Sequence, residues 1–152
     1  MAKTPAIVAA ERAGVPFTLV GYEHDPGVTA YGLEAARKLG VDPARVFKTL
    51  VVQIDGAPVV AIVPVESELD LRALGKRVAM AKPADAERIT GYVEGGISPL
   101  GQRRPLRTLV DESVLAFATI FVSAGRRGLE IELAPGDLIA LTEGETRRLA
   151  RR

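Results

Sequence analysis

The 152-residue chain is 47% hydrophobic and 26% charged, which is typical of a single globular domain. It contains no cysteine, so disulfides, thiolate zinc sites and a cysteine nucleophile are excluded. It has one histidine, His24, whereas a catalytic zinc site usually takes about two or three imidazoles. We therefore expect no metal, no other cofactor, and one domain over residues 1–152.

The charge and hydropathy of the chain limit its partners. The net charge is only +1, whereas a dedicated nucleic-acid-binding domain carries a large positive excess. Any contact with RNA is then expected to be local and sensitive to salt. The apolar run near the N-terminus is too short for a secretion signal. Because no stretch approaches the roughly 20 apolar residues of a membrane-spanning helix, we expect a cytoplasmic protein.

The first elements are marked by helix-capping residues. Thr4 suits a helix N-cap, Pro5 the first helical position, and Gly14 the end of that helix. Residues 17–22 are expected to form a strand, and residues 33–39 a second helix that ends at a glycine.

A hairpin follows. Residues 42–43 begin a short turn, and two apolar strands are expected at 47–54 and 58–64. The Asp55-Gly56 pair between these strands is a strong signal for a tight hairpin turn.

The second half predicts weaker helices and a second hairpin. Helical segments are expected near 70–77 and 83–89, then a glycine-rich loop at 91–101 and a strand at 106–110. The predicted elements of the C-terminal part are a strand at 120–123, a turn at 124–128, a strand at 129–133, a helix at 135–141 and a fraying end at 147–152.

Hairpins dominate this order of elements, and alternation of strand, helix and parallel strand is weak. We therefore predict an α+β fold, with a mixed, mostly antiparallel curved sheet flanked by helices.

Lys48 is the first candidate for a functional side chain. Because side chains alternate along a strand, it shares a face with Leu50, Val52 and Ile54. A lysine at the start of this apolar face can hold its ammonium at the mouth of a pocket, where low dielectric strengthens its grip on a phosphate or carbonyl oxygen. The alternative is that its stem packs while its charged end reaches water.

The run Gly-Gly-Ile-Ser-Pro-Leu-Gly at 95–101 is the second candidate. Glycines let backbone N–H groups approach a ligand closely, and consecutive amides can form an anion-binding nest. The run lacks the Gly-Lys-Ser/Thr of a nucleotide-hydrolase phosphate loop. A simple tight turn is the alternative.

Three other polar groups also have two interpretations. The run Ser-Ala-Gly-Arg-Arg-Gly at 123–128 offers amides and charge to a phosphate, or is a solvated turn. The pair His24-Asp25 suggests a general base, although we expect an exposed polar surface instead. The arginines at 103, 104 and 107 hold a tRNA backbone or keep a loop and strand edge soluble.

Four of these segments occur together in a recognisable order. They are Tyr-Glu-His-Asp-Pro at 22–26, Val-Phe-Lys-Thr-Leu at 46–50, Thr-Gly-Tyr at 90–92 with Gly-Gly-Ile-Ser-Pro-Leu-Gly-Gln at 95–102, and Ser-Ala-Gly-Arg-Arg-Gly-Leu at 123–129. This order resembles the YbaK/EbsC family of Cys-tRNA(Pro) deacylases, relatives of the editing domain inserted in bacterial prolyl-tRNA synthetases. The resemblance runs from about residue 4 to residue 141.

The resemblance implies a fold and an activity. The fold is a mixed sheet curved into a partial barrel with surrounding helices. The activity is hydrolysis, in trans, of the ester between a wrong amino acid and the terminal adenosine of proline tRNA, in company with prolyl-tRNA synthetase. The substrate's own thiol attacks its carbonyl and cysteine leaves as a thiolactone, so the enzyme needs no cysteine.

The resemblance also implies roles for particular residues. We expect Lys48 to anchor the terminal ribose-phosphate and the amides of Gly95 to Ile97 to orient the aminoacyl group. The positions implied are, for catalysis, Lys48 and Gly95 and, for substrate binding, Tyr22, Thr49, Gly96, Ile97, Ser98, Ser123 and Gly125. One departure is Ala124, where the family usually has glycine, because alanine is strained if that position needs positive φ.

Two other functions remain open at this point. The same fold can serve a tRNA mischarged with alanine or serine, because a small pocket separates similar side chains poorly. A non-catalytic module that binds tRNA or the synthetase is the other alternative, and it would protect the ester instead of turning it over.

Overall fold

The computed structural model describes residues 2–151. These residues contain four α-helices and eight strands, and the strands form two sheets. The helices are α1 (Pro5–Ala13), α2 (Tyr31–Leu39), α3 (Pro83–Thr90) and α4 (Pro135–Thr142). The strands are β1 (Phe17–Gly21), β2 (Phe47–Ile54), β3 (Ala57–Pro64), β4 (Val78–Met80), β5 (Thr108–Asp111), β6 (Ile120–Arg126), β7 (Leu129–Leu133) and β8 (Glu145–Arg147). None of the described helices is long and apolar enough to cross a membrane.

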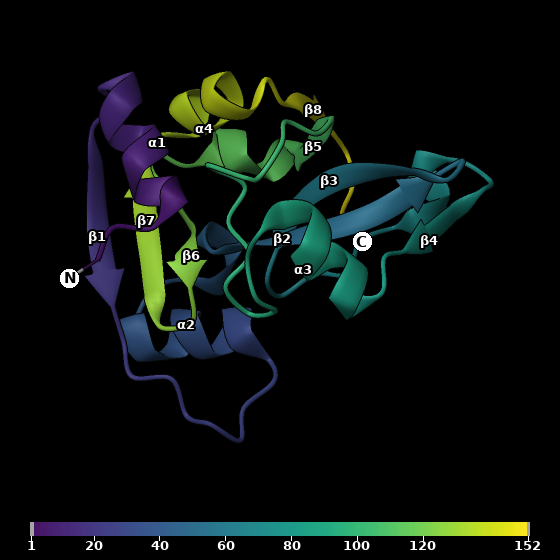
Figure 1. Ribbon diagram of the computed structural model, residues 1–152. Helices are drawn as coiled ribbons and strands as arrows, with labels where there is room; N and C mark the ends of the chain where they lie inside the picture. The colour runs from purple at the N-terminus through teal and green to yellow at the C-terminus, as the bar shows by residue number, and fades with distance from the viewer. Residues whose placement is uncertain (1, 152) are drawn as a thin grey trace.

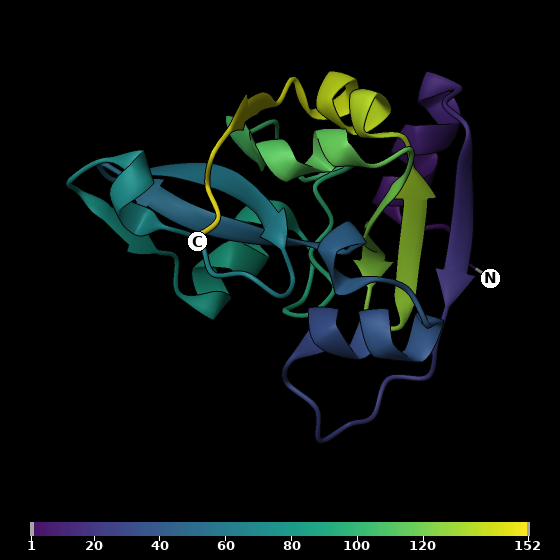
Figure 2. The ribbon, with the colours of Figure 1, turned by 180° about the vertical axis from the view of Figure 1, so that it is seen from behind.

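The α+β class is confirmed, and the strands divide between two sheets. One sheet is antiparallel with the order β1-β7-β6, and the other is mixed with the order β4-β2-β3-β5-β8. In the mixed sheet β5 runs parallel to β3 and β8 parallel to β5. A parallel bridge between Val46 and Phe121 joins the two sheets without closing them into a barrel. Figure 1 and the reverse view in Figure 2 show α2 across one end of β6 and β7.

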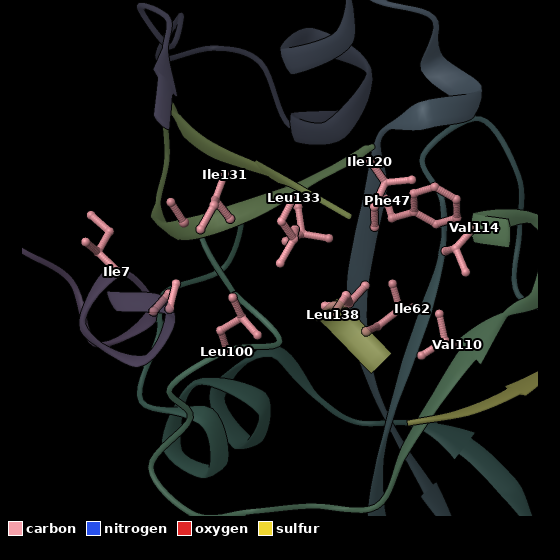
Figure 3. Close-up of a cluster of buried hydrophobic side chains, with 14 of the residues drawn as sticks. Ile7, Phe47, Ile62, Leu100, Val110, Val114, Ile120, Ile131, Leu133 and Leu138 are labelled. Carbon is pink, nitrogen blue, oxygen red and sulfur yellow. The ribbon is translucent and has the colours of Figure 1, made fainter. Parts of the chain in front are cut away.

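The main core lies where α1 and α4 meet both sheets. Figure 3 shows Ile7 of α1, Ile131 of β7, Leu138 of α4 and Ile62 of β3 in this cluster. Each of these side chains is at most 3% exposed, and full burial of such a side chain contributes about 1.5–3 kcal/mol. The core thus fixes the two sheets relative to each other.

The capping signals of α1 are confirmed. The hydroxyl of Thr4 accepts a hydrogen bond from the amide of Ile7 (3.2 Å), Pro5 begins the helix, and Gly14 ends it with φ 71°. The second helix, α2, begins at Tyr31, two residues earlier than expected. The β2–β3 hairpin turns at Asp55 and Gly56 as predicted, and both residues have positive φ.

The helix expected near 70–77 and the turn of the second hairpin differ from the structure. The helix expected near 70–77 is wrong, because Asp70 caps only a single 3₁₀ segment, Leu71–Leu74, which Gly75 ends with φ 128°. The second hairpin has a shorter turn than expected, since β6 continues to Arg126 through an irregularity that begins at Ser123.

The expected fraying at 147–152 is wrong for the described residues up to 151. Leu149 is fully buried, and its amide and that of Ala150 donate to Oδ1 of Asp111 at 2.8 and 2.9 Å. The amide of Ser113 donates to the other carboxylate oxygen at 3.2 Å. Burial works to raise the pKa of Asp111, but these hydrogen bonds outweigh it and hold the pKa below its usual value. Asp111 therefore anchors the C-terminal segment.

We expect Asp111→Ala to lower the free energy of unfolding by about 3 kcal/mol, because it leaves buried amides without an acceptor. Urea denaturation at neutral pH measures this loss, with the exposed neighbour Glu112→Ala as control. Since the pKa is depressed on folding, this stability is present above the ordinary pKa of 3.8 and disappears as the pH falls through the folded value. Equal stability of both variants would contradict the anchor.

Candidate functional site

A pocket of about 440 Å³ opens where five parts of the chain converge. Its walls are β2, the start of α2, the start of α3, the loop after α3, and a face formed by the end of β1 with β6 and β7. The volume falls within the range of roughly 300–1,000 Å³ that is usual for small-molecule sites. Six of the residues expected from the sequence line this pocket: Tyr22, Lys48, Thr49, Gly95, Ile97 and Ser123.

Lys48 lies on the part of β2 that has a free edge. β4 pairs with β2 only at 52–54, so the earlier part of β2 has β3 on one side and the pocket on the other. Lys48 is half-buried and makes no ion pair with another described residue. Burial lowers the pKa of its ammonium, and the carboxylate of Glu68 opposes this shift. The ammonium is thus available to an anionic or carbonyl ligand in a partly desolvated place.

Thr49 adds polar groups to the same edge. The carbonyl of Val51 points away from β3 and accepts a hydrogen bond from the amide of Ala81 at 3.0 Å. Backbone polar groups two residues apart on a strand point to the same side, so those of Thr49 point to the free edge of β2. The hydroxyl of Thr49 is buried and has no hydrogen-bond partner among the described residues. A buried hydroxyl usually has a partner, so this wall retains unused hydrogen-bonding capacity.

Tyr22 and Ser123 form the opposite wall. The amide of Tyr22 donates to the carbonyl of Gly128 at 2.9 Å, which fixes the end of β1 against the β6–β7 hairpin. Burial and the nearby charge of Glu130 raise the pKa of Tyr22 to about 12, so its phenol stays protonated. The hydroxyl of Ser123 accepts a hydrogen bond from the amide of Gly125 at 3.1 Å.

The loop at Gly95 is held against the start of α2. Gly95 has φ 84°, and a Cβ built on it would lie 2.6 Å from the ring of Tyr31. Arg127, in the β6–β7 turn, places its guanidinium 4.9 Å from the centre of that ring and donates from Nε to the carbonyl of Glu94 at 2.7 Å. Only glycine fits at 95, and Arg127 fixes both parts of this wall.

Three of the expected residues lie outside the pocket lining. The amide of Gly96 donates to the carbonyl of Val93 at 2.9 Å, and a Cβ there would lie 2.7 Å from the Cα of Arg126. Ser98 is fully buried, where its hydroxyl accepts from the amide of Leu100 at 3.2 Å. Gly125 takes φ 109° against Tyr92. These residues shape the loop and the hairpin.

Ala124 is accommodated without strain. It does not have positive φ, and its side chain is fully buried in the main core. Its carbonyl accepts a hydrogen bond from the hydroxyl of Thr4. Positive φ occurs one residue later, at Gly125, and Ala124 itself does not line the pocket.

His24 is not the exposed polar residue that we expected. Its side chain is 16% exposed, and Nδ1 lies 2.6 Å from a carboxylate oxygen of Glu34, which is itself fully buried. The other oxygen of Glu34 accepts from the amide of Asp25 at 2.9 Å, and Lys38 lies 3.7 Å away. Burial works to raise the pKa of Glu34, but its hydrogen bonds and the nearby charges outweigh it and lower the pKa. Glu34 thus fastens the segment after Tyr22 to α2.

The arginines after the glycine loop have separate surroundings. Arg107 pairs with Glu145 at 3.0 Å, and this exposed pair supports the parallel strands β5 and β8. The side chain of Arg103 lies against Gly91, and Arg104 is exposed. None of the three lines the pocket.

Glu130 is a pocket residue that the sequence analysis missed. It alternates with Leu129 and Ile131, so the pattern places it on a polar outer face, yet it is 6% exposed and lines the pocket. Burial raises its pKa to about 8. The start of α2 was also missed as a wall, including Tyr31 and Gly32. Tyr31, at the start of that helix, was the sequence signal available for this wall.

The site is therefore a pocket whose polar groups are an ammonium, hydroxyls, free backbone amides and a buried carboxyl. Within residues 2–151 no group of three or more histidine, aspartate or glutamate side chains is placed to hold a metal ion. The lining contains no histidine, and the hydroxyl of Ser123 is bonded to an amide instead of a base. Such a site can bind and polarise an ester without supplying a nucleophile of its own.

Comparison with known proteins identifies the class. The family model of the aminoacyl-tRNA editing domain matches residues 24–141, which include every pocket wall except the end of β1. The chain belongs to this family of aminoacyl-tRNA deacylases.

Individual relatives show which members of the family this chain resembles. The chain is 43% identical over 116 residues to EbsC of Enterococcus faecalis, named as a candidate Cys-tRNA(Pro)/Cys-tRNA(Cys) deacylase, covering 72% of this chain and 71% of that protein. It is 29% identical to a proline–tRNA ligase of Acidithiobacillus ferrooxidans, over 85% of this chain and 22% of the ligase. A solved structure described as a candidate trans-editing enzyme for prolyl-tRNA synthetase has the same fold, with a TM-score of 0.82, 24% identity and full coverage of both chains.

Proposed function

We propose that this editing domain removes cysteine that has been attached in error to proline tRNA. The proposal rests on the pocket beside Lys48, in a chain 43% identical to the Enterococcus protein named for Cys-tRNA deacylation. The whole of residues 1–152 acts as one editing domain in this proposal. It works in trans, on aminoacyl-tRNA that leaves prolyl-tRNA synthetase, and therefore in the cytoplasm, where tRNA is charged.

Lys48 and Gly95 carry the catalytic roles in this proposal. Lys48 anchors the terminal ribose-phosphate, which its unpaired and partly desolvated ammonium suits. The amides of Gly95 and Ile97 orient the aminoacyl group, because the amide of Gly96 is already bonded to Val93.

The remaining expected residues support the substrate in two ways. Tyr22, Thr49 and Ser123 contact it from the pocket walls. Gly96, Ser98 and Gly125 act indirectly, by fixing the loop and the hairpin that carry those walls.

The substrate supplies the nucleophile. Its cysteine sulfur attacks its own carbonyl carbon, the ester C–O bond breaks, the ribose oxygen takes the thiol proton, and cysteine leaves as a thiolactone. The lining residues fit this chemistry, since they contain no cysteine or histidine to act in its place. The protein contributes positioning and stabilisation of the developing negative charge.

The synthetase is the partner that delivers the tRNA. With a net charge of +1, the chain has little electrostatic attraction for RNA at a distance. Transient association with prolyl-tRNA synthetase brings the acceptor end close to the pocket and removes the need for tight independent binding.

The test is release of radiolabelled amino acid from Cys-tRNA(Pro), Ala-tRNA(Pro) and Pro-tRNA(Pro), with the protein at catalytic concentration. We expect rapid loss of cysteine and retention of proline. Loss of alanine in its place would identify a sister specificity. Absence of turnover on all three esters would contradict an editing deacylase for this tRNA and favour a binding module.

A further inference from the structure

Glu130 is a buried carboxyl without a partner inside the proposed substrate pocket. It lies in the middle strand of the antiparallel sheet, opposite Val20 of β1 and Ser123 of β6. Its neighbours in sequence, Leu129 and Ile131, point into the main core, so its own side chain faces the pocket. No hydrogen bond or ion pair from a described residue reaches its carboxylate, and burial alone accounts for its raised pKa of about 8.

The other glutamate on the same face of β7 has the partners that Glu130 lacks. Glu132 accepts hydrogen bonds from the hydroxyl of Thr119 (2.5 Å) and from Arg45 (3.1 Å). Burying a carboxylate without a cation costs free energy of folding. Glu130 therefore does not stabilise the fold through an ion pair, as Glu132 does.

The titratable groups around Glu130 do not supply the missing cation. Tyr22, directly after β1, is neutral, Glu94 from the loop is acidic, and Lys48 from β2 lines the same pocket without an ion pair to Glu130. The lining thus has an acidic end at Glu130 and a basic residue, Lys48, on β2. An aminoacyl-tRNA end carries the complementary pair, an α-ammonium and a ribose-phosphate.

We propose that Glu130 binds the α-ammonium of the aminoacyl group and makes the domain specific for esters with a free amino group. This inference rests on the proposed function, since it concerns the same pocket. It adds a substrate class that the domain rejects: acyl-tRNA whose α-nitrogen is acylated or absent, including peptidyl-tRNA. An acylated nitrogen has no charge and brings bulk against a buried carboxyl group.

The selectivity follows from desolvation. When the α-ammonium enters, the carboxyl of Glu130 releases its proton to solvent, and the resulting carboxylate accepts a charge-assisted hydrogen bond from the ammonium in a partly desolvated place. An ester without that nitrogen leaves the carboxyl unpartnered, and sites with buried polar groups discriminate strongly against ligands that fail to pair them. Editing would then spare growing peptides and remain directed at free aminoacyl-tRNA.

The experiment compares Cys-tRNA(Pro) with mercaptopropionyl-tRNA(Pro), which keeps the thiol and the ester but has hydrogen in place of the amino group. The smaller analogue cannot be excluded by its size. We measure kcat/KM for both esters with wild type and with Glu130→Gln. The preference for Cys-tRNA(Pro) is expected to be at least about tenfold larger in the wild type than in Glu130→Gln. Taking this ratio cancels the different intrinsic reactivity of the two esters.

Two further variants serve as controls. Glu132→Gln removes a carboxylate from the same strand and the same face, and it is expected to keep the wild-type preference. Glu130→Asp keeps the charge and is expected to retain part of the preference, which guards against misfolding of the glutamine variant.

The outcomes separate this inference from the proposed function. A wild type that cleaves Cys-tRNA(Pro) but keeps its full preference after Glu130→Gln would overturn the role of Glu130 and leave the deacylase intact. A wild type that cleaves neither ester would overturn the proposed function, and the inference with it.

Discussion

Replacing Lys48 with alanine is expected to lower kcat/KM for deacylation of Cys-tRNA(Pro) at least about tenfold, because the substrate loses the ammonium that anchors its terminal phosphate. Lys48 has no ion pair among the described residues, so its removal leaves no carboxylate unpaired. The fold should persist, since the position is half-buried on a strand fixed by β3. Single-turnover release of labelled cysteine measures the loss.

The matched variant for Lys48 is Lys48→Met, which keeps an unbranched stem of similar length and removes only the charge. We expect it to be as inactive as Lys48→Ala. If Lys48→Met retained near-normal activity while Lys48→Ala did not, packing of the stem would be the contribution of this residue. Near-normal activity in both variants would refute the anchoring role.

Gly95→Ala is expected to abolish most activity and to destabilise the protein. The new Cβ would lie 2.6 Å from the ring of Tyr31 at a backbone φ of 84°. The backbone strain alone costs about 1–3 kcal/mol. The ring must also move, and a displacement of about 1 Å at a catalytic wall can reduce the rate roughly a hundredfold. Thermal unfolding and the cysteine-release assay measure the two effects on one preparation.

Gly27→Ala is the control for this glycine. Gly27 lies in the loop before α2, lacks positive φ, and has no atom within 4 Å of a built Cβ. It is expected to match the wild type in both assays. A Gly95→Ala protein that behaved like Gly27→Ala would show that the loop and the Tyr31 ring yield easily, and that the close fit at Gly95 has no catalytic importance.

Local signals predicted much of the fold. Thr4, Pro5 and Gly14 defined α1, and Asp55-Gly56 defined the β2–β3 hairpin, because each of these features is decided by the backbone preferences of a few adjacent residues. The helix near 70–77 failed because Gly75 takes a conformation that ends the segment after one 3₁₀ stretch.

Features that depend on distant contacts were harder to predict. The end of the chain looked polar and loose, but Asp111, almost forty residues away in sequence, buries and binds Leu149 and Ala150. Of the site, the order of motifs indicated Lys48 and the loop at Gly95. Alternation along β7 directed Glu130 outward, because a strand pattern cannot tell that another part of the chain covers that face.

Glu130 also makes the stability of the domain depend on whether a ligand fills the pocket. Its carboxyl has a pKa of about 8 when folded, against an ordinary value of 4.5, so between these two values the folded chain holds a proton that the unfolded chain has released. The free energy of unfolding therefore declines as the pH rises through this window and levels off above it. A ligand that brings an ammonium to this carboxyl relieves that penalty and stabilises the folded state by mass action. Glu130 therefore contributes least to the stability of the empty domain above about pH 8, and an ammonium ligand is expected to raise the free energy of unfolding most in that range.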